Sequence, residues 1–253
     1  MTKERLDTLV QRQTGLSRSQ AQGLINTGKV YDAQGRKLDK AGLRVDETAV
    51  LEIRRDEMRY VSRGGYKLEA ALDHFAIGVT GRIAIDVGAS TGGFTDCLLQ
   101  RGATRVYAVD VGYGQLAWRL RQDDRVHVMD RTNIRHLTPD RLSECPDFFT
   151  VDCSFISLRL VLPPLAALLA PGAAGVVLIK PQFEAGRQDV GKGGVVRDPA
   201  IHERVIQEFR EAAAGMGFTG SDVIPSPVVG PAGNREFLAY LPRFSSLSTQ
   251  ETS

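Results

Sequence analysis

Cysteine is scarce in this sequence: its 253 residues include three, Cys97, Cys145 and Cys153. An odd number of cysteines without a CxxC pair predicts neither a disulfide framework nor a zinc site. No cluster of His, Cys and Asp has the spacing of metal ligands, so we expect no bound metal. The N-terminus, MTKERLDTLV, is charged and lacks the apolar core of a signal peptide. These features favour a cytoplasmic protein.

A long uninterrupted hydrophobic run is also missing. The nearest candidate is residues 160–179, twenty uncharged residues between Arg159 and Lys180, a length that would suffice for a membrane span. Prolines at 163, 164 and 171 and glycines at 172 and 175 interrupt this stretch. We therefore predict a buried helix, a Pro-Gly stop and a strand, and expect no membrane contact.

The net charge of +2 is too small to indicate a nucleic-acid partner by itself, but its distribution is uneven. Residues 1–60 hold 12 Lys and Arg against 9 Asp and Glu, a balance of +3, whereas residues 61–253 hold 20 against 21, a balance of −1. Since phosphate contacts dominate affinity for RNA, the basic excess favours an RNA-docking segment at the N-terminus. A chance asymmetry of a solvated surface is the alternative.

Residues 1–60 are predicted to form a small α+β unit with a linker. Apolar side chains at helical spacing predict helices over 4–13 and 18–26, with Gly15 ending the first and Ser17 capping the second. Two or three short strands follow, up to residue 53. The polar segment 54–65 ends in two glycines, and we place the domain boundary there.

Residues 61–243 alternate between strand and helix patterns. Strands are predicted at 82–88, 105–112, 126–130, 147–154, 174–180, 222–230 and 235–241. Helices are predicted near 66–76, 92–101, 115–121, 138–143, 158–169 and 199–216. This alternation predicts an α/β fold with a mostly parallel, seven-stranded sheet, covered by helices on both faces and ending in an antiparallel hairpin at one edge. Residues 244–253 are predicted to be a disordered tail.

The turn after the first of these strands has the composition of a ligand-binding loop. The strand ends at Asp86 and is followed by Gly88, Ser90 and the pair 92–93, and such glycines let a ligand approach the backbone. The next strand ends at Asp110, 24 residues later, where an acid is suited to hold both hydroxyls of a ribose. The spacing is not GxGxxG and no Walker lysine is present, which favours a cationic sulfonium cofactor. A simple tight turn is the alternative.

Asp130 ends the third strand, at the same predicted edge of the sheet. It could meet an adenine amino group there. Capping of the turn that follows is the alternative for this residue.

Four ionisable residues fall at positions that we predict to be buried, where a charged side chain is unfavourable without a partner: Lys67, Asp152, Lys180 and Glu236. A ribose 2′-hydroxyl is a poor nucleophile and must lose its proton while it attacks a methyl donor. Lys180 can accept that proton if a second cation, Lys67, and partial desolvation disfavour its ammonium form. Asp152 and Glu236 would orient the lysines and the hydroxyl. A paired, water-exposed lysine at a strand end is the alternative for Lys180.

Several segments together resemble one family of enzymes. Residues 5–30, RLDTLVQRQTGLSRSQAQGLINTGKV, are similar to the alpha-L, or S4-type, RNA-binding domain. The motifs SRGGYKL, DVGASTGGFTD, VDVGYGQL, DCSFISL, LIKPQFE, GKGGVVRD and GNREF resemble the TlyA family, also called haemolysin A-like rRNA methyltransferases. The resemblance extends to about residue 242.

The resemblance implies an S4-type RNA-binding domain followed by a Rossmann-like class I methyltransferase domain of the RrmJ/FtsJ type. It implies S-adenosylmethionine-dependent 2′-O-methylation of cytidine, with ribosomal RNA or ribosomal subunits as partner and no obligate protein partner. The family's catalytic tetrad falls on Lys67, Asp152, Lys180 and Glu236. The expected cofactor-binding residues are Asp86, Gly88, Ala89, Ser90, Thr91, Gly92, Gly93, Phe94, Asp110 and Asp130. The residues expected to contact RNA are Arg5, Arg18, Lys29 and Arg63.

Three alternative functions stay open. A cytosine C5-methyltransferase would use Cys153 as a thiolate nucleophile, but the side chain after Asp152 should point to the opposite face, and Lys180 would have no role. A membrane-lytic protein, which the older family name suggests, would need a spanning or amphipathic segment, for which residues 160–179 are the candidate. A non-catalytic RNA-binding protein would have no need of the complete tetrad.

Overall fold

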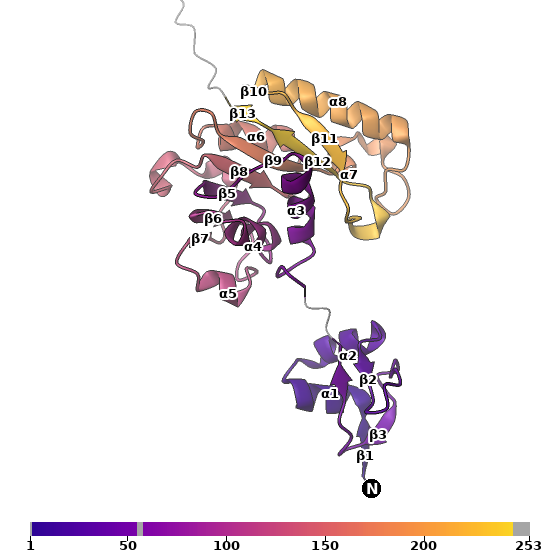
Figure 1. Cartoon of the computed structure of the whole chain (residues 1–253). Helices are drawn as coiled ribbons and strands as arrows, with labels where there is room; N and C mark the ends of the chain where they lie inside the picture. Colours follow the sequence, from indigo (N-terminus) through magenta and orange to yellow (C-terminus); the bar gives the residue numbers. More distant parts are fainter. Residues whose placement is uncertain (1, 55–57, 245–253) are drawn as a thin grey trace, which may run out of the picture. The chain divides into compact units, whose positions relative to one another are not determined.

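The computed structural model describes residues 2–54 and 58–244, and the chain divides into two compact units, residues 1–57 and 58–253 (Figure 1). Each unit has a hydrophobic core of its own. Of the predicted tail, residues 245–253 lie outside the described residues.

The N-terminal unit combines two helices with two small antiparallel sheets. Its helices are α1 (Leu6–Thr14) and α2 (Arg18–Asn26), and its strands are β1 (Lys3–Arg5), β2 (Val30–Tyr31), β3 (Arg44–Asp46) and β4 (Glu52–Ile53). The first helix begins later than expected because residues 3–5 pair with residues 44–46, while β2 pairs with β4. Gly15 ends α1 with a φ of 70°, and Ser17 forms a capping box with Gln20 at the start of α2.

The second unit is built on a seven-stranded sheet, so the predicted, mostly parallel α/β fold is confirmed. In spatial order the strands are β11 (Asp222–Pro225), β12 (Phe237–Leu241), β9 (Ala174–Ile179), β8 (Phe148–Val151), β5 (Ile83–Val87), β6 (Arg105–Val109) and β7 (Val126–Met129). The five strands from β9 to β7 are parallel. β11 and β12 form the antiparallel hairpin expected at one edge of the sheet, with β11 outermost and β12 also pairing antiparallel with β9.

Helices cover both faces of this sheet, because successive side chains of a strand point to opposite faces. On one face, α3 (Gly64–His74), α4 (Gly93–Gln100) and α5 (Trp118–Arg121) share a core with Phe148. On the other face lie α6 (Leu158–Ala166) and α8 (Pro199–Gly215) (Figure 1). They share a core with Phe149. One short helix, α7 (Pro181–Glu184), begins right after Lys180 at the end of β9.

Several predicted elements differ from the observed ones. The helix expected near 138–143 does not form, so this prediction is wrong: residues Pro139–Arg141 form one 3-10 turn. Leu142 alone offers too little apolar surface for a helical face. The helix expected at 158–169 ends at Ala166. Phe244, predicted as part of the tail, is buried in β13 (Arg243–Phe244), which pairs with β10 (Phe218–Thr219).

Candidate active site

Two cavities open at the carboxyl ends of the parallel strands. The first, called the lysine cavity, has a volume of about 630 Å³ and is lined by Lys67, Lys180 and Glu236, among others. The second, called the Asp110 cavity, has a volume of about 420 Å³ and is lined by residues 109–111 and 132–134, among others. The residues that line both cavities are Gly88, Ser90, Asp152, Ser154 and Phe155. Two ligands can therefore be held side by side, with their contact at Asp152.

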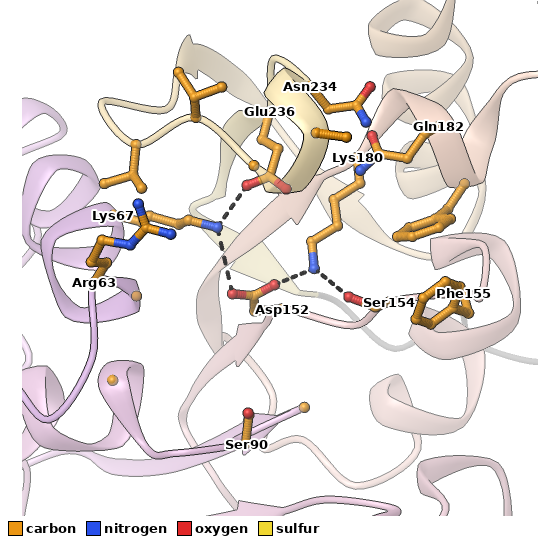
Figure 2. Close-up of a pocket in the computed structure, with 18 of the residues that line it drawn as sticks. Arg63, Lys67, Ser90, Asp152, Ser154, Phe155, Lys180, Gln182, Asn234 and Glu236 are labelled. Atoms are coloured by element: carbon orange, nitrogen blue, oxygen red, sulfur yellow. Dashed lines mark hydrogen bonds and ion pairs between the residues drawn. The ribbon is translucent and has the colours of Figure 1, made fainter. Parts of the chain in front are cut away.

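The four ionisable residues singled out in the sequence come together in the lysine cavity (Figure 2). Lys67 Nζ lies 2.6 Å from Glu236 Oε2 and 3.9 Å from Asp152 Oδ2. Lys180 Nζ lies 2.5 Å from Asp152 Oδ1 and donates a hydrogen bond to Ser154 Oγ at 2.9 Å. Asp152 thus stands between the two lysines, with one carboxylate oxygen toward each.

The positions of these side chains follow from the elements that carry them. Asp152 and Lys180 are the first residues beyond β8 and β9, and these strands are parallel neighbours, so both residues emerge at the same edge. Lys67 comes from α3, which packs on β12, and Glu236 directly precedes β12. The sheet order therefore joins residues that lie 169 positions apart in the chain, Lys67 and Glu236.

The cluster is largely removed from water. The side chains of Glu236, Lys180 and Lys67 are 1%, 8% and 11% exposed, and that of Asp152 is 21% exposed. Two lysines and two carboxylates balance formally, and buried ionised groups require such pairing. Lys180 is therefore not the water-exposed strand-end lysine that the sequence left as an alternative.

The glycine turn after β5 forms the wall between the two cavities. Gly88 approaches the neighbouring strand end so closely that a Cβ there would lie 2.6 Å from the Asp152 carbonyl oxygen. The backbone N–H of Ser90 donates to Asp110 Oδ2 at 2.7 Å, and that of Gly112 donates to Asp110 Oδ1 at 2.7 Å. Asp110 is thereby fixed in the wall of the cavity named after it, at the strand end where the sequence predicted it.

Asp86 does not line either cavity. Its side chain is fully buried and accepts hydrogen bonds from Thr95 Oγ1 at 2.7 Å and Thr150 Oγ1 at 2.8 Å. Burial raises the pKa of Asp86 to about 6, against the lowering effect of the two threonine hydroxyls. The residue supports the glycine turn from behind and does not present its carboxylate to a ligand.

Asp130 also lies outside both cavities. It pairs with Arg121 Nη2 at 2.6 Å and accepts a hydrogen bond from the backbone N–H of Gly114 at 3.2 Å. Burial acts to raise the pKa of Asp130, but the hydrogen bonds from Arg121 and Gly114 outweigh it and hold that pKa below its usual value. Asp130 thus forms an ion pair with α5, while Thr132 and Asn133 line the Asp110 cavity.

Among the other expected cofactor residues, the turn residues Gly88 and Ser90 line both cavities, while Ala89, Thr91, Gly93 and Phe94 line the lysine cavity. Gly92 lines neither cavity. It starts α4 as a left-handed N-cap residue with a φ of 97°, which is a structural position in the turn.

Phe155 is a site residue that the sequence reasoning missed. Its side chain is 90% exposed although it lies where the two cavities meet, and its φ of 64° is rare for a bulky residue. The ring of Phe183 lies 5.0 Å from its ring. The available signal was an aromatic residue three positions after a strand-end acid, in DCSF, together with the phenylalanine of PQFE.

Cys153 donates a weak hydrogen bond from Sγ to the Val87 carbonyl at 3.7 Å. Burial, and after it the neighbouring Asp152 carboxylate, raises the pKa of this thiol to about 12. A nucleophilic cysteine needs the opposite environment, one that stabilises the thiolate. The structure therefore disfavours the base-methylating alternative.

Three of the four residues expected to contact RNA lie in the N-terminal unit. Arg5 and Arg18 both pair with the buried Asp7, at 2.9 Å and 3.4 Å, while their side chains stay 44% and 61% exposed. Lys29 is half-buried just before β2. Arg63 belongs to the other unit, where it is exposed at the rim of the lysine cavity (Figure 2).

In residues 2–54 and 58–244, no group of three His, Cys, Asp or Glu side chains is arranged to hold a metal ion. None of the helices in these two ranges combines the length and the apolar character needed to cross a membrane. Residues 160–179 are divided between α6, a turn and β9.

The chain is similar to known proteins in sequence and in structure. The family model of FtsJ-like methyltransferases matches residues 60–243. The chain is 52% identical over 241 residues to the rRNA methyltransferase candidate YqxC of Bacillus subtilis, covering 94% of this chain and 85% of that protein. It is 47% identical over 234 residues to the 16S/23S rRNA (cytidine-2′-O)-methyltransferase TlyA of Mycobacterium tuberculosis, covering 92% and 87%. Among solved structures, a candidate hemolysin from Streptococcus thermophilus is similar with a TM-score of 0.76 at 46% identity, covering 97% of this chain and 90% of that chain.

Proposed function

The chain belongs to the FtsJ-like methyltransferase family, and from this we propose that it methylates the ribose 2′-hydroxyl of cytidine in ribosomal RNA, with S-adenosylmethionine as methyl donor. The observation that carries the proposal is the junction of the two cavities at Asp152, with Lys180 beside it. The Asp110 cavity suits the cofactor, and the lysine cavity suits the nucleotide that receives the methyl group.

The residues of the Asp110 cavity fit the cofactor. Its volume of about 420 Å³ is in the range of small-molecule sites, and Asp110 offers a carboxylate to ribose hydroxyls. Thr132 and Asn133 supply polar groups, while Val109 and Ile134 supply apolar walls. Within residues 2–54 and 58–244, no lysine or arginine lines this cavity, which suits a cationic sulfonium better than a pyrophosphate. When bound, S-adenosylmethionine supplies an electrophilic methyl group.

Lys180 is the group placed to take the proton of the attacking hydroxyl. In its neutral form, Nζ accepts that proton and becomes an ammonium, which Asp152 Oδ1 then stabilises at 2.5 Å. Ser154 Oγ, at 2.9 Å, gives Nζ a second fixed partner and so sets its direction. Positioning of this amine against the hydroxyl supplies much of the expected acceleration.

Lys67 and Glu236 complete the cluster behind Asp152. Glu236 holds Lys67 at 2.6 Å, and Lys67 faces the second oxygen of Asp152 at 3.9 Å. Lys67 and Lys180 thus share the carboxylate of Asp152, one at each oxygen. Lys67 therefore acts on the base through Asp152, and Glu236 keeps Lys67 in place.

The exposed Phe155 gives the lysine cavity a flat apolar surface beside the tetrad. Proteins that act on RNA commonly stack an unpaired base on such a ring. We therefore assign Phe155 to hold the base whose ribose enters the cavity. The N-terminal unit, with its basic excess and its similarity to S4-type domains, is assigned to dock the RNA through Arg5, Arg18 and Lys29.

The test is methyl transfer from labelled S-adenosylmethionine to purified small and large ribosomal subunits, followed by mass mapping of the modified nucleotides. We expect label on 2′-O-methylcytidine. Label on 5-methylcytidine would support the base-modifying alternative, and cofactor binding without any transfer would support a non-catalytic RNA-binding protein.

Substitution of the proposed base tests the mechanism. We expect Lys180→Ala to lower the methyl-transfer rate by about 100-fold or more, the range of general base catalysis. Its affinity for S-adenosylmethionine, measured by calorimetry, should stay nearly unchanged, since Lys180 does not line the Asp110 cavity. Arg141→Ala, which removes an exposed cation outside both cavities, is the matched control. Turnover near that of the parent protein in the Lys180 variant would contradict the assigned role.

A further inference from the structure

One wall of the lysine cavity is a glycine-rich loop, residues 190–196, that no catalytic assignment includes. Val190, Gly193 and Gly194 line the cavity. The loop is closed by a bridge in which the backbone N–H of Gly191 donates to the Val195 carbonyl at 3.0 Å. Gly193 and Gly194 have φ values of 80° and 74°, so the loop lacks the backbone restraint that residues with a Cβ would give.

Asn234 holds this loop in place through its side chain. Its side chain is buried (3% exposed) and lines the cavity (Figure 2). Its Nδ2 donates to the Gly194 carbonyl at 2.9 Å, and its Oδ1 accepts from the Val196 N–H at 3.1 Å. One amide thus satisfies a donor and an acceptor of the loop at the same time, which neither a carboxylate nor an aliphatic side chain can do.

The backbone of Asn234 also fixes the turn that carries Glu236. Its carbonyl accepts a hydrogen bond from the Gly230 N–H at 2.9 Å. Gly230 in turn lies against Glu236, where an added Cβ would be 2.4 Å from Oε1. In the described part of the chain that oxygen has no hydrogen-bond partner, while Oε2 binds Lys67. The orientation of the Glu236 carboxylate therefore depends on the packing of this turn.

We propose that Asn234 is a positioning residue: it ties the 190–196 loop to the turn before β12 and so sets the shape of the nucleotide site and the direction of Glu236. The inference rests on the proposed function, because it assigns the lysine cavity to the RNA nucleotide. Asn234 acts through the loop and the turn, and the Asp110 cavity does not include it.

Asn234→Ala separates this role from a general loss of structure. We expect kcat/KM for ribosomal RNA to fall by about 10- to 100-fold, the effect of a small misplacement at a reaction centre, with a higher KM for the RNA. The Kd for S-adenosylmethionine should change by less than about 2-fold, since free-energy effects on a separate site are small. Gln207→Ala, which removes an exposed amide on α8, is the matched control.

Hydrogen exchange followed by mass spectrometry gives a readout that does not depend on activity. Peptides that cover residues 190–197 should exchange faster in Asn234→Ala than in the parent protein, and peptides that cover residues 83–94 should not. If the parent protein transfers no methyl group, the proposed function fails. The difference in exchange still tests whether Asn234 holds the 190–196 loop. Unchanged exchange at 190–197 would overturn the inference even with an active parent enzyme.

Asn234→Asp supplies a second variant that keeps the size of the side chain. A protonated carboxyl can donate to Gly194 and accept from Val196, whereas a carboxylate can only accept. Position 234 is buried, and burial raises the pKa of a carboxyl placed there. The activity of this variant relative to the parent protein, compared at each pH, should therefore rise as the pH is lowered from 8.5 to 6. A ratio that is flat or that falls would overturn the donor-and-acceptor role of Asn234.

Discussion

At the scale of single residues, Cys153 shows how burial decides between two chemistries. Its thiol lines the Asp110 cavity, yet burial raises the pKa of this group to about 12, so it stays protonated at neutral pH. We expect Cys153→Ser to retain methyl transfer within about 3-fold of the parent rate, because a serine hydroxyl can donate to the same Val87 carbonyl. Methyl-transfer assays with ribosomal subunits check this, and loss of activity with intact cofactor affinity would revive a nucleophilic role.

Asp86 gives a pH dependence whose sign can be worked out. Its pKa in the folded protein is about 6, above the ordinary value of 3.8, because the carboxyl is buried. Between pH 4 and pH 6 the folded protein therefore holds a proton that the unfolded chain has lost. The contribution of this group to stability is consequently greatest below pH 4 and falls as the pH rises to 6.

We expect the stability of the parent protein relative to Asp86→Asn to increase on acidification, by about 2 kcal/mol between pH 7 and pH 4.5, because most of the shift of about 2 pKa units is expressed in that range. Urea unfolding at the two pH values measures the difference. Asp140→Asn, at an exposed carboxyl, is the control and should show no such change. A difference between parent and variant that does not depend on pH would mean that Asp86 is ionised throughout.

At the scale of secondary-structure elements, Glu184 connects two helices that frame the site. It lies at the end of α7 and accepts hydrogen bonds from Ser157 Oγ at 2.7 Å and from the Leu158 N–H at 2.8 Å, at the start of α6. Residues 154–157, which include Phe155, are thus held between the end of β8 and the start of α6. The capping residue of α6 is itself oriented by a side chain from another helix.

Removal of this contact should loosen the second unit. We expect Glu184→Ala to lower the free energy of unfolding by about 1–3 kcal/mol, because the buried N–H of Leu158 loses its acceptor. Urea unfolding of the full chain, followed by circular dichroism, measures the change. Glu211→Ala, on the exposed face of α8, should stay within about 0.5 kcal/mol of the parent protein. Equal stability of the two variants would show that water replaces Glu184 at no cost.

At the scale of the whole molecule, the two units differ in charge and in the sites that they contain. The first carries the basic excess and the second carries the two cavities. We expect deletion of residues 1–57 to weaken binding to ribosomal subunits and to reduce the slope of log K against log salt, since phosphate contacts are lost. Affinity for S-adenosylmethionine should remain, because every residue that lines the Asp110 cavity belongs to the second unit. A salt slope equal to that of the full chain would remove the RNA-docking role from the N-terminal unit.

Much of the fold and part of the site could be predicted from local pattern alone. Apolar runs that end in Asp110, Asp152 and Lys180 predict where parallel strands stop, and parallel strands stop at a common edge. Local pattern did not show that Asp86 and Asp130 lie outside the two cavities, because their partners, Thr150 and Arg121, are brought to them by tertiary packing.

The sequence by itself determined the alternation of strands and helices, the glycine turn and the residue types of the tetrad. These properties depend on neighbours along the chain, through side-chain period, backbone freedom and charge. Only the tertiary structure decided that β12 lies between β9 and β11, that Lys67 meets Glu236 across 169 positions, and that Asn234 holds the 190–196 loop. Such contacts depend on strand order and helix packing, and the free energy of the whole core selects that arrangement.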